Sequence, residues 1–314
     1  MTLSVTMYHK EDRGEWDALV DSARNGLFMH RRDYMEYHAD RFDDVSAVAR
    51  IDGKAVALLP ASIDRDCALA ISHAGLTFGG VLLARDLRGE NALAAIDLLL
   101  DVLKTAGARE LEVRVLPPEF CTYPSGEVPY GLWRRGFRLS RRDLSTILPL
   151  EKGIAFNGAK RRSVSKALEG GVEICRGNVV AFHDLLTDVL RIRHNVAPVH
   201  SLSELEWLIA TFPEKILLRT ATMKGVVLAG ILLFQYPTVW HAQYMVASPE
   251  GRNVGALDVL IANAINDARK TNASWFSFGT STTDSGKILN EGLIWQKESF
   301  GGRSITHDFM RGVL

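Results

Sequence analysis

The sequence predicts an α/β (α+β) protein of two tandem domains, each a mixed, largely antiparallel sheet flanked by helices. Three observations predict it. The chain has 314 residues, about twice the length of a common single domain. Its two halves repeat one order of elements: a glycine turn, two strands, a second glycine turn, an amphipathic helix and a further strand. No low-complexity linker separates the halves, so we expect domains at residues 1–150 and 151–314.

Composition and charge exclude several classes of protein. Apolar residues make up 47% of the chain and charged residues 24%, as in globular proteins and unlike disordered or membrane-spanning ones. The 37 basic side chains balance 37 acidic ones, so we expect no overall attraction to DNA or to an anionic membrane. Three cysteines without a CxxC pair indicate a reducing compartment, no disulfide framework and no cysteine-rich zinc site, and we expect no bound metal. No apolar run approaches the ~20 residues of a spanning helix, which predicts a cytoplasmic protein without a transmembrane segment.

The first copy of the repeat has a hairpin turn at Gly53, where glycine permits a left-handed backbone. Its long helix carries apolar residues at the i, i+3, i+4 spacing that indicates one buried face. Gly107 stands where the cap of that helix is expected. The expected elements are helices over 15–23, 32–39 and 89–107 and strands over 55–63, 69–76, 110–116 and 143–150.

The second copy repeats this order from a turn at Gly225, and Asn272 stands where its long helix is expected to end. A glycine-aromatic turn is expected before the last strand of each copy, at residues 131–137 and 292–302. The expected elements are helices over 160–169, 180–193 and 255–272 and strands over 226–234, 239–247, 274–279 and 304–310.

This order of elements, with a glycine loop at the start of a helix, resembles the fold of Gcn5-related N-acetyltransferases (GNAT). The family signature is Gln/Arg-x-x-Gly-x-Gly/Ala, and the second half matches it at Arg252 and Gly255 but has Leu257 at the last position. The resemblance implies that acetyl-CoA or another acyl-CoA is the cofactor, with its pyrophosphate at the helix N-terminus. The implied cofactor-binding residues are Arg252, Asn253, Val254, Gly255 and Ala256. The counterpart in the first half, residues 88–92, matches less closely.

Two such domains in one chain are similar to the FemA/FemB/FemX aminoacyltransferases. Three segments carry this resemblance: the basic helix start at 160–172, the segment 255–279, and 292–301, which looks like a "G-L-x-x-x-K-x-x-F-G" ending. The resemblance implies transfer of an acetyl or aminoacyl group to an amine of a sugar-linked cell-envelope or polysaccharide precursor, with the second domain as the main active-site half. The chain has no obvious inserted coiled-coil arm for tRNA, and it looks closer to shorter bacterial FemAB-like proteins linked to surface-polysaccharide pathways.

The strand expected over 239–247 carries the candidate catalytic residues. Strand alternation places His241 and Gln243 on one face and Trp240, Ala242 and Tyr244 on the other. The resemblance puts this strand at the acyl site, so we expect His241 to be the general base and Gln243 or Tyr244 to orient substrate. The unperturbed pKa of histidine suits that task. The alternative is a hydrogen-bonded histidine on a sheet surface.

Polar and basic residues elsewhere are candidates for binding the acceptor and its phosphates. Guanidinium groups pair bidentately with phosphate, and Arg161 and Arg162 are consecutive on an expected helix. By the Fem resemblance, Lys297 contacts a sugar-nucleotide diphosphate or the acceptor. The full set of substrate-binding candidates is His73, Arg161, Arg162, Asn195, His200, Ser281, Lys287, Glu291 and Lys297. For each the alternative is an ordinary solvated or structural side chain.

Two other functions compete with acyl transfer to a sugar-linked amine. One is a Fem-like peptidyl ligase that takes its amino acid from aminoacyl-tRNA, which would make tRNA a partner. The other is a catalytically inert GNAT-like binding protein, which the imperfect loop at Gly255–Leu257 favours.

Overall fold

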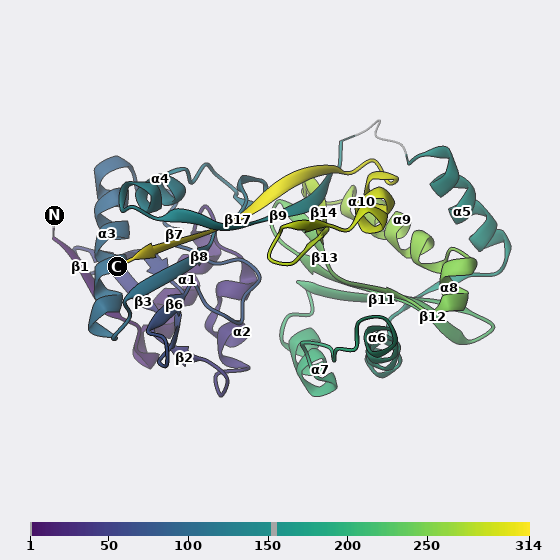
Figure 1. Ribbon diagram of the computed structural model, residues 1–314, viewed down its shortest axis with the longest axis horizontal. Coiled ribbons are helices and arrows are strands. Elements are labelled where there is room, and N and C mark those ends of the chain that lie inside the picture. Colours follow the sequence, from purple (N-terminus) through teal and green to yellow (C-terminus); the bar gives the residue numbers. More distant parts are fainter. Residues whose placement is uncertain (1, 152–155) are drawn as a thin grey trace. The chain divides into compact units, whose positions relative to one another are not determined.

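The computed structural model describes residues 2–151 and 156–314, and the chain forms two compact units (Figure 1). Unit 1 contains the chain up to Asp143, Asp284–Lys287 and Thr306–Leu314. Unit 2 contains Leu144–Thr283 and Ile288–Ile305. Each unit combines helices with a mixed sheet, so the expected fold class is confirmed. The expected boundary adjoins residues 152–155, which lie outside the described residues.

Unit 1 contains strands of two sheets. The first sheet is antiparallel, in the order β1 (Leu3–Met7), β3 (Ala47–Ile51), β4 (Lys54–Leu59) and β7 (Leu82–Leu83). In the described part of the chain, the second is an 11-stranded sheet, and its strands at this end follow the order β17 (Arg303–Val313), β8 (Glu110–Arg114), β6 (Leu69–Ile71), β5 (Ser62–Asp64) and β2 (Asp43–Asp44). Only the β6–β8 pair is parallel among these neighbours. The last strand of the chain therefore pairs with β8 of the first unit, a pairing that the sequence repeat does not predict.

The helices of unit 1 are α1 (Arg13–Ser22), α2 (Arg32–Glu36), α3 (Gly89–Thr105) and α4 (Glu127–Arg134), with short 3-10 turns at Lys10–Asp12, Phe28–His30 and Pro118–Phe120. The apolar face expected on the long helix is buried in α3, through Ala92, Ala95, Ile96, Leu99, Leu100 and Leu103. The segment 131–137, expected as a turn, is instead largely the end of α4. Its residues pack on α3, and that burial stabilises a helix where the glycine suggested a turn.

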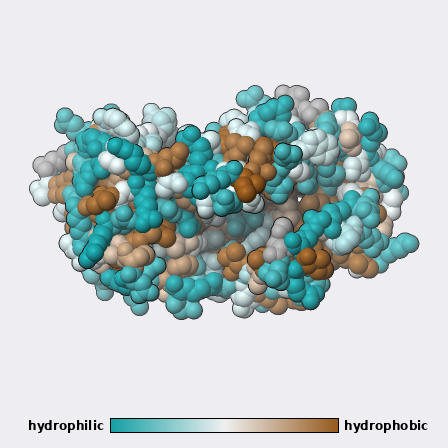
Figure 2. Space-filling model, in the orientation of Figure 1, coloured by the Kyte–Doolittle hydropathy of each residue, from teal (hydrophilic) through white to brown (hydrophobic). Residues whose placement is uncertain are grey.

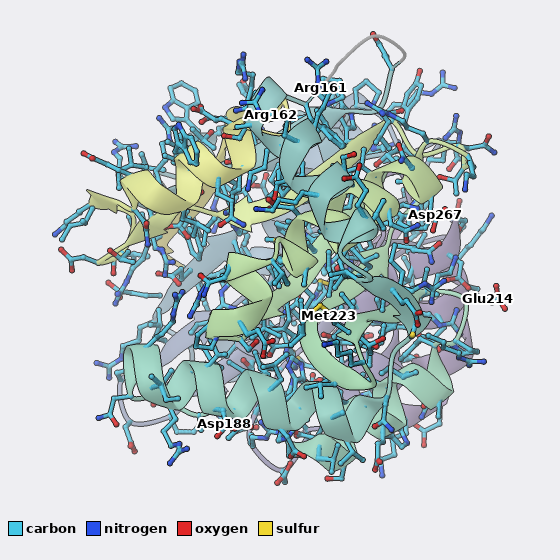
Figure 3. All side chains as sticks on the ribbon, turned by 90° about the vertical axis from the view of Figure 1, so that its right-hand side faces the viewer. Arg161, Arg162, Asp188, Glu214, Met223 and Asp267 are labelled. Atoms are coloured by element: carbon cyan, nitrogen blue, oxygen red, sulfur yellow. The ribbon has the colours of Figure 1, made fainter. Side chains whose placement is uncertain are left out.

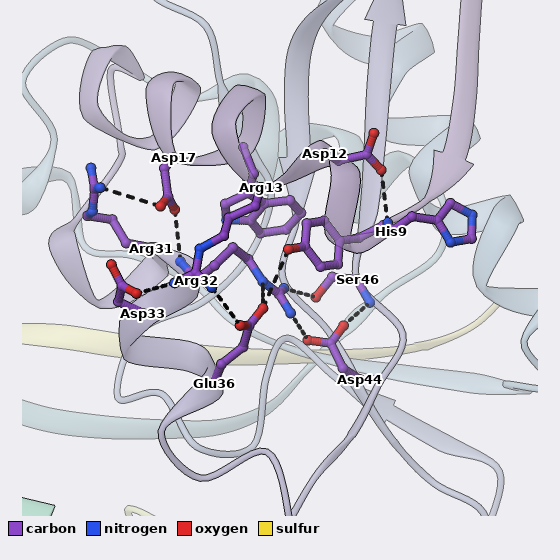
Figure 4. Close-up of polar contacts among 12 residues, drawn as sticks. His9, Asp12, Arg13, Asp17, Arg31, Arg32, Asp33, Glu36, Asp44 and Ser46 are labelled. Atoms are coloured by element: carbon purple, nitrogen blue, oxygen red, sulfur yellow. Dashed lines mark hydrogen bonds and ion pairs between the residues drawn. The ribbon is translucent and has the colours of Figure 1, made fainter.

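A buried arginine ties α2 to the neighbouring strands of unit 1 (Figure 4). Arg32 donates from Nε to Glu36 at 2.9 Å and from a terminal nitrogen to Asp44 at 2.7 Å. Its guanidinium also lies over the ring of Tyr8, 3.8 Å from the centroid. Two carboxylates and an aromatic face thus compensate a charge that would otherwise be costly to bury.

The sheet strands of unit 2 run in the order β10 (Glu173–Arg176), β11 (Ile216–Met223), β12 (Val226–Gln235), β13 (Val239–Ala247), β14 (Trp275–Thr280) and the end of β9 (Arg138–Pro149). All neighbours are antiparallel except β13 and β14. The hairpin turn expected at Gly225 is present, and Gly225 has a φ of 79° that mirrors the 83° of Gly53 in unit 1. Both turns feed a strand, as the repeat predicts.

Helices cover both faces of the unit 2 sheet (Figure 1). One face packs on α9 (Ala256–Ala268), with α5 (Gly158–Glu169) against it, and the other on α6 (Val179–His194) and α7 (Leu202–Thr211). Gly230 makes room for α6, because a Cβ there would lie 2.4 Å from the ring of Phe182. The remaining elements are α8 (Pro249–Asn253), β15 (Thr282–Thr283), β16 (Ile288–Leu289) and α10 (Glu291–Glu298). The second expected glycine-aromatic turn, 292–302, is thus mostly helix α10.

The surface carries no large apolar band on the face that Figure 2 shows, where hydrophobic residues form separate small patches among hydrophilic ones. Among the described residues, no helix has both the length and the apolar character needed to cross a bilayer.

Candidate functional site

The candidate site begins where β13 and β14 of unit 2 part. The two strands pair in parallel only at Val239–Trp275, Trp240–Phe276 and His241–Ser277. Beyond that point β13 stays hydrogen-bonded to β12, while β14 stays with β9. Diverging strands leave a wedge between them, and backbone and side chains that line a wedge are open to a ligand.

A β-bulge on β13 lies just beyond the point of divergence. Leu232 pairs with Tyr244 and Leu233 with Ala242, so Gln243 has no partner on β12. The extra residue changes the phase of the side chains. His241 and Tyr244 therefore share a face, and the expected alternation that put Tyr244 beside Ala242 is corrected. The side-chain oxygen Oε1 of Gln243 is buried and has no hydrogen-bond partner among the described residues.

His241 lies at the closed end of the wedge and is only 6% exposed. Its Nδ1 shares a hydrogen bond of 3.0 Å with the hydroxyl of Ser277, and that hydroxyl also accepts from the backbone N–H of Gly279. Gly279 has a φ of 72°, and a Cβ on it would lie 3.6 Å from the His241 ring. The strand end is therefore folded closely around the imidazole, which fixes the ring orientation.

Tyr244 is held by His200, which the sequence suggested as a substrate ligand. The phenol oxygen and His200 Nδ1 are 2.6 Å apart, and the two rings meet edge to face. Burial raises the pKa of Tyr244 to about 12, so the phenol keeps its proton at neutral pH. His200 is itself buried, and its carbonyl accepts a hydrogen bond from His183 if that imidazole carries its proton on Nε2. This pair positions β13 against the loop before α7.

Lys297 is buried and binds the end of β14. Its ammonium group donates to the carbonyls of Gly279 and Thr280 at 2.8 and 2.5 Å and to the hydroxyl of Ser281 at 2.9 Å. Burial lowers the pKa of Lys297 to about 7. The contacts give Lys297 and Ser281 a role in joining α10 to the strand end; their role as substrate ligands stays a prediction.

An open cavity of about 710 Å³ lies beside the end of β13 in unit 2. The last residues of β13, Met245–Ala247, form one wall, and three aliphatic residues of α6 form another. The rest of the lining comes from polar and aromatic side chains of the β15–α10 region, from two arginines and from the start of α9. The lining residues used below are Lys160, Arg193, Arg252, Gly255, Asp258, Thr283, Asn290, Trp295 and Gln296. The volume lies within the range of small-molecule sites.

Two uncompensated arginines face this cavity. Arg193 is on α6 and Arg252 on α8, and neither has an ion-pair partner in the described part of the chain. Desolvation and the charge of Arg193 lower the pKa of Arg252. Lys160 and Asp258, by contrast, compensate each other at 2.7 Å. The cavity is thus lined by two positive charges without an ion-pair partner among the described residues, and such charges can bind a ligand that carries phosphate.

The loop before α9 differs from the one that the resemblance implies. Gly255 has a φ of 77° and caps the helix, and a Cβ on it would lie 2.6 Å from the hydroxyl of Ser163 on α5. The backbone N–H groups of Arg252, Val254 and Gly255 already donate within the α8 turn. Of the five implied cofactor residues, Arg252 and Gly255 line the cavity, whereas Asn253 is exposed and Ala256 is buried. A diphosphate would therefore rely more on guanidinium groups than on loop amides.

None of the nine predicted substrate-binding residues lines this cavity, and neither do His241, Gln243 and Tyr244. Arg161 and Arg162 project outward from α5 into solvent (Figure 3). Asn195 is exposed and ends α6 in a left-handed conformation, and Glu291 is exposed at the start of α10. The two remaining candidates, Lys287 and His73, belong to unit 1, where Lys287 is exposed and His73 is buried with a φ of 61°.

Sequence reasoning missed Arg193 and Trp295. A basic residue near the end of a helix is common for electrostatic reasons alone, so Arg193 carried no distinguishing signal. Trp295 stood in the Fem-like ending but was counted as part of a turn. Within residues 2–151 and 156–314 no group of three or more His, Cys, Asp or Glu side chains is arranged to hold a metal ion.

Comparison with known proteins agrees with this geometry. A family model for the acetyltransferase (GNAT) domain matches residues 159–285, which include the wedge and the α8–α9 loop. No curated protein matches the sequence.

Solved structures of similar fold cover nearly the whole chain. The structure of FemX superposes with a TM-score of 0.71 at 14% identity, over 99% of this chain and 97% of that one. L-PGS from Bacillus licheniformis gives 0.60 at 11% identity, over 88% and 90%. A tandem GNAT protein from the clavulanic acid biosynthesis pathway gives 0.54 at 12% identity, over 99% and 98%. At these identities the likeness shows the fold. The matched model shows a GNAT acetyltransferase domain at residues 159–285, and the likeness to FemX and to the tandem GNAT protein shows a tandem GNAT fold over nearly the whole chain.

Proposed function

We propose that the unit 2 cavity binds the diphosphate-bearing acyl donor of an amine N-acyltransferase, with an acyl-CoA as the donor. The observation that carries this proposal is the pair of uncompensated guanidinium groups, Arg193 and Arg252, that face one cavity beside the end of β13. Two guanidinium groups and the N-terminus of α9 supply the charge and the hydrogen-bond donors that a diphosphate requires.

The acceptor in this proposal is an amine on a sugar-linked envelope or polysaccharide precursor. Trp295 lines the cavity and is 62% exposed, which leaves an aromatic face free to pack against a sugar ring. Thr283 and Gln296 line the same region and offer neutral donors and acceptors for sugar hydroxyls, and Asn290, whose oxygen caps α10, adds a side-chain N–H donor. Neutral polar groups beside an aromatic face support an uncharged sugar better than an acidic one.

The chemistry assigned to the chain's own residues is positioning and proton transfer. The acceptor amine attacks the acyl carbonyl, a C–N bond forms, the C–S bond to the donor breaks, and the amine loses one proton. Gln243 Oε1 has no partner, so it is the group we assign to accept a hydrogen bond from the attacking amine. His241, fixed by Ser277 near the bulge, is the proposed proton acceptor, as the sequence suggested.

Isothermal titration with acetyl-CoA tests the donor site. We expect binding that Arg252→Ala and Arg193→Ala each weaken by about tenfold to a hundredfold, since a hydrogen bond to a charged group contributes about 1.5–3 kcal/mol. Arg191→Ala is the matched control, because Arg191 lies on the same helix as Arg193 but is paired with Asp188 and does not line the cavity. Equal affinity in all three variants would refute the assignment of the diphosphate to this cavity.

Aminoacyl-tRNA is the second candidate donor, and the backbone N–H groups already engaged in the α8 turn are the observation that supports it. Three loop amides that would otherwise hold a pyrophosphate are already bonded within that turn. The same guanidinium groups can hold the backbone phosphates at the end of a tRNA. Binding of aminoacyl-tRNA without binding of acetyl-CoA would select this donor. No binding of either donor, together with binding of a UDP-linked amino sugar, would favour an inert binding protein.

A further inference from the structure

Unit 1 contains a second wedge, built like the one in unit 2. Strands β6 and β8 pair in parallel from Leu69–Glu110 to Ile71–Glu112, and a single parallel bridge joins Gly79 to Val115. Beyond the bridge one segment leaves for β7 in the other sheet, and the other enters the proline-rich loop that starts at Leu116. A cavity of about 500 Å³ lies in the space between them, and all of its lining residues belong to unit 1.

The lining of this cavity is unlike that of the unit 2 cavity. None of its lining residues is a lysine or an arginine, and its walls consist largely of aliphatic and proline side chains. The only carboxylate is that of Asp308, and Arg142 binds both of its oxygens at 2.6 and 2.7 Å. The amide of Asn25 is also engaged, because it donates to Val81 at 2.8 Å and accepts from Leu83 at 2.9 Å. The charged and amide groups at this cavity thus already have partners.

The one thiol in the lining behaves as an apolar group. Cys121 is partly buried beside the proline loop, and burial raises the pKa of its thiol to about 11. A neutral thiol resembles a small hydrophobic side chain in its contacts. A charged ligand would find no counter-charge in this cavity and would pay for its desolvation.

We propose that the unit 1 cavity is a binding site for an uncharged hydrocarbon group, such as an alkyl or acyl chain. The apolar walls, the paired polar groups and the volume carry this inference, and it does not depend on which donor unit 2 takes. A diphosphate or a charged sugar is excluded from this cavity, whereas an apolar chain gains by leaving water.

Cys121 provides a reporter inside the proposed site. The rate of its modification by methyl methanethiosulfonate, followed by peptide mass spectrometry at pH 9, measures access to the cavity. We expect 1-hexanol to slow the reaction of Cys121 in a saturable way, by about tenfold at ten times the dissociation constant. The reaction of the exposed Cys67 should not change, which controls for the reagent. Glycerol, which is neutral but polar, should give no protection.

Filling the cavity should abolish the effect of hexanol. Val128 is buried in the cavity wall, so Val128→Phe occupies the space, and Val81→Ile does so with a smaller change if the first variant fails to fold. Val226→Phe is the matched control, because Val226 is more than half exposed in unit 2. Saturable protection that Val128→Phe or Val81→Ile removes and Val226→Phe keeps supports the site. A Cys121 that never reacts, lacks protection by hexanol, or is protected equally in the filled variants would overturn it.

Discussion

Gln243 links a β-bulge in the backbone to a candidate role in binding the acceptor amine. It is the unpaired residue of the β13 bulge, and its side-chain oxygen is buried without a partner among the described residues. A buried unsatisfied acceptor costs free energy, and a ligand that donates a hydrogen bond to it would remove that cost. The residue type was visible in the sequence as part of a polar strand. The bulge was not, because it depends on how β13 pairs with β12.

We expect Gln243→Leu to lower kcat by about tenfold to a hundredfold, because loss of the acceptor misplaces the attacking amine. The dissociation constant of the donor should not change, since Gln243 is not among the residues that line the cavity. Steady-state kinetics and titration of the same variant separate the two effects. Gln235→Leu, at the end of β12, is the control of equal size. A loss of donor binding that equals the loss of kcat would contradict the role given to Gln243.

Lys297 makes a second prediction at the residue scale. Its folded pKa of about 7 is below the unfolded value of 10.5, so the unfolded chain binds more protons between those limits. The contribution of Lys297 to the free energy of unfolding should therefore rise with pH, by about 1.4 kcal/mol per pH unit, and be lost as pH falls toward 7.

Urea unfolding at pH 7, 8 and 9 measures this effect as the difference between wild type and Lys297→Met. Lys287→Met is the matched control, because Lys287 is exposed. Parallel pH profiles for wild type and Lys297→Met would contradict the lowered pKa of Lys297.

At the scale of elements, the predictable features are those that depend on local spacing. The apolar face of α3 and the cap at Gly107, which has a φ of 91°, follow from residues three and four apart. The helices α4 and α10 were expected as turns, because their glycine and aromatic residues gave a stronger local signal than their short apolar faces. Tertiary packing, which local sequence rules do not describe, stabilises α4 and α10 as helices.

The close packing of α5 against α9 leads us to predict that Gly255→Ala destabilises the protein. Alanine at Gly255 faces two costs: the left-handed backbone, about 1–2 kcal/mol, and a clash with the hydroxyl of Ser163 at 2.6 Å. Gly225 has nearly the same φ, but a Cβ there meets nothing within 4 Å. Gly225→Ala should therefore lose only the backbone term, and Gly255→Ala should lose more. Urea denaturation of both variants gives the difference, and equal losses would show that the two helices do not depend on this contact.

At the scale of the whole chain, unit 1 has a concentration of buried neutral histidines. Burial lowers the pKa of His30 and His307 to about 4, and that of His73 to about 3. Each is therefore neutral in the folded chain and protonated in the unfolded chain between these values and about 6.5. The free energy of unfolding should fall as pH drops below 6.5, by about 1.4 kcal/mol per pH unit for each histidine.

Hydrogen exchange at pH 7 and pH 5 measures this effect by region, after correction for intrinsic rates. We expect amides of β3, β4 and α3 in unit 1 to lose protection at pH 5 before those of β11 and β12 in unit 2. The reverse order would contradict the assignment of acid sensitivity to these three histidines.

The duplicated fold could be predicted from the sequence, whereas the partners of its closing strands could not. The fold repeat can be recognised in one sequence from local features: the turns at Gly53 and Gly225 and the two amphipathic helices. The pairing of β17 with β8, from Phe309–Arg114 to Val313–Glu110, joins segments about two hundred residues apart. The spacing of apolar residues does not predict this pairing, because any strand with a suitable apolar face could pair with β8.

That pairing also sets an order of events during synthesis. Residues 306–314 leave the ribosome after all of unit 2 has been made, yet they pair with β8 of unit 1. The edge of β8 is consequently left without this partner while unit 2 is being translated, and an open edge invites pairing with other chains. A nascent chain that stalls near residue 300 should therefore expose β8, and chaperones that cover strand edges would be needed for that interval.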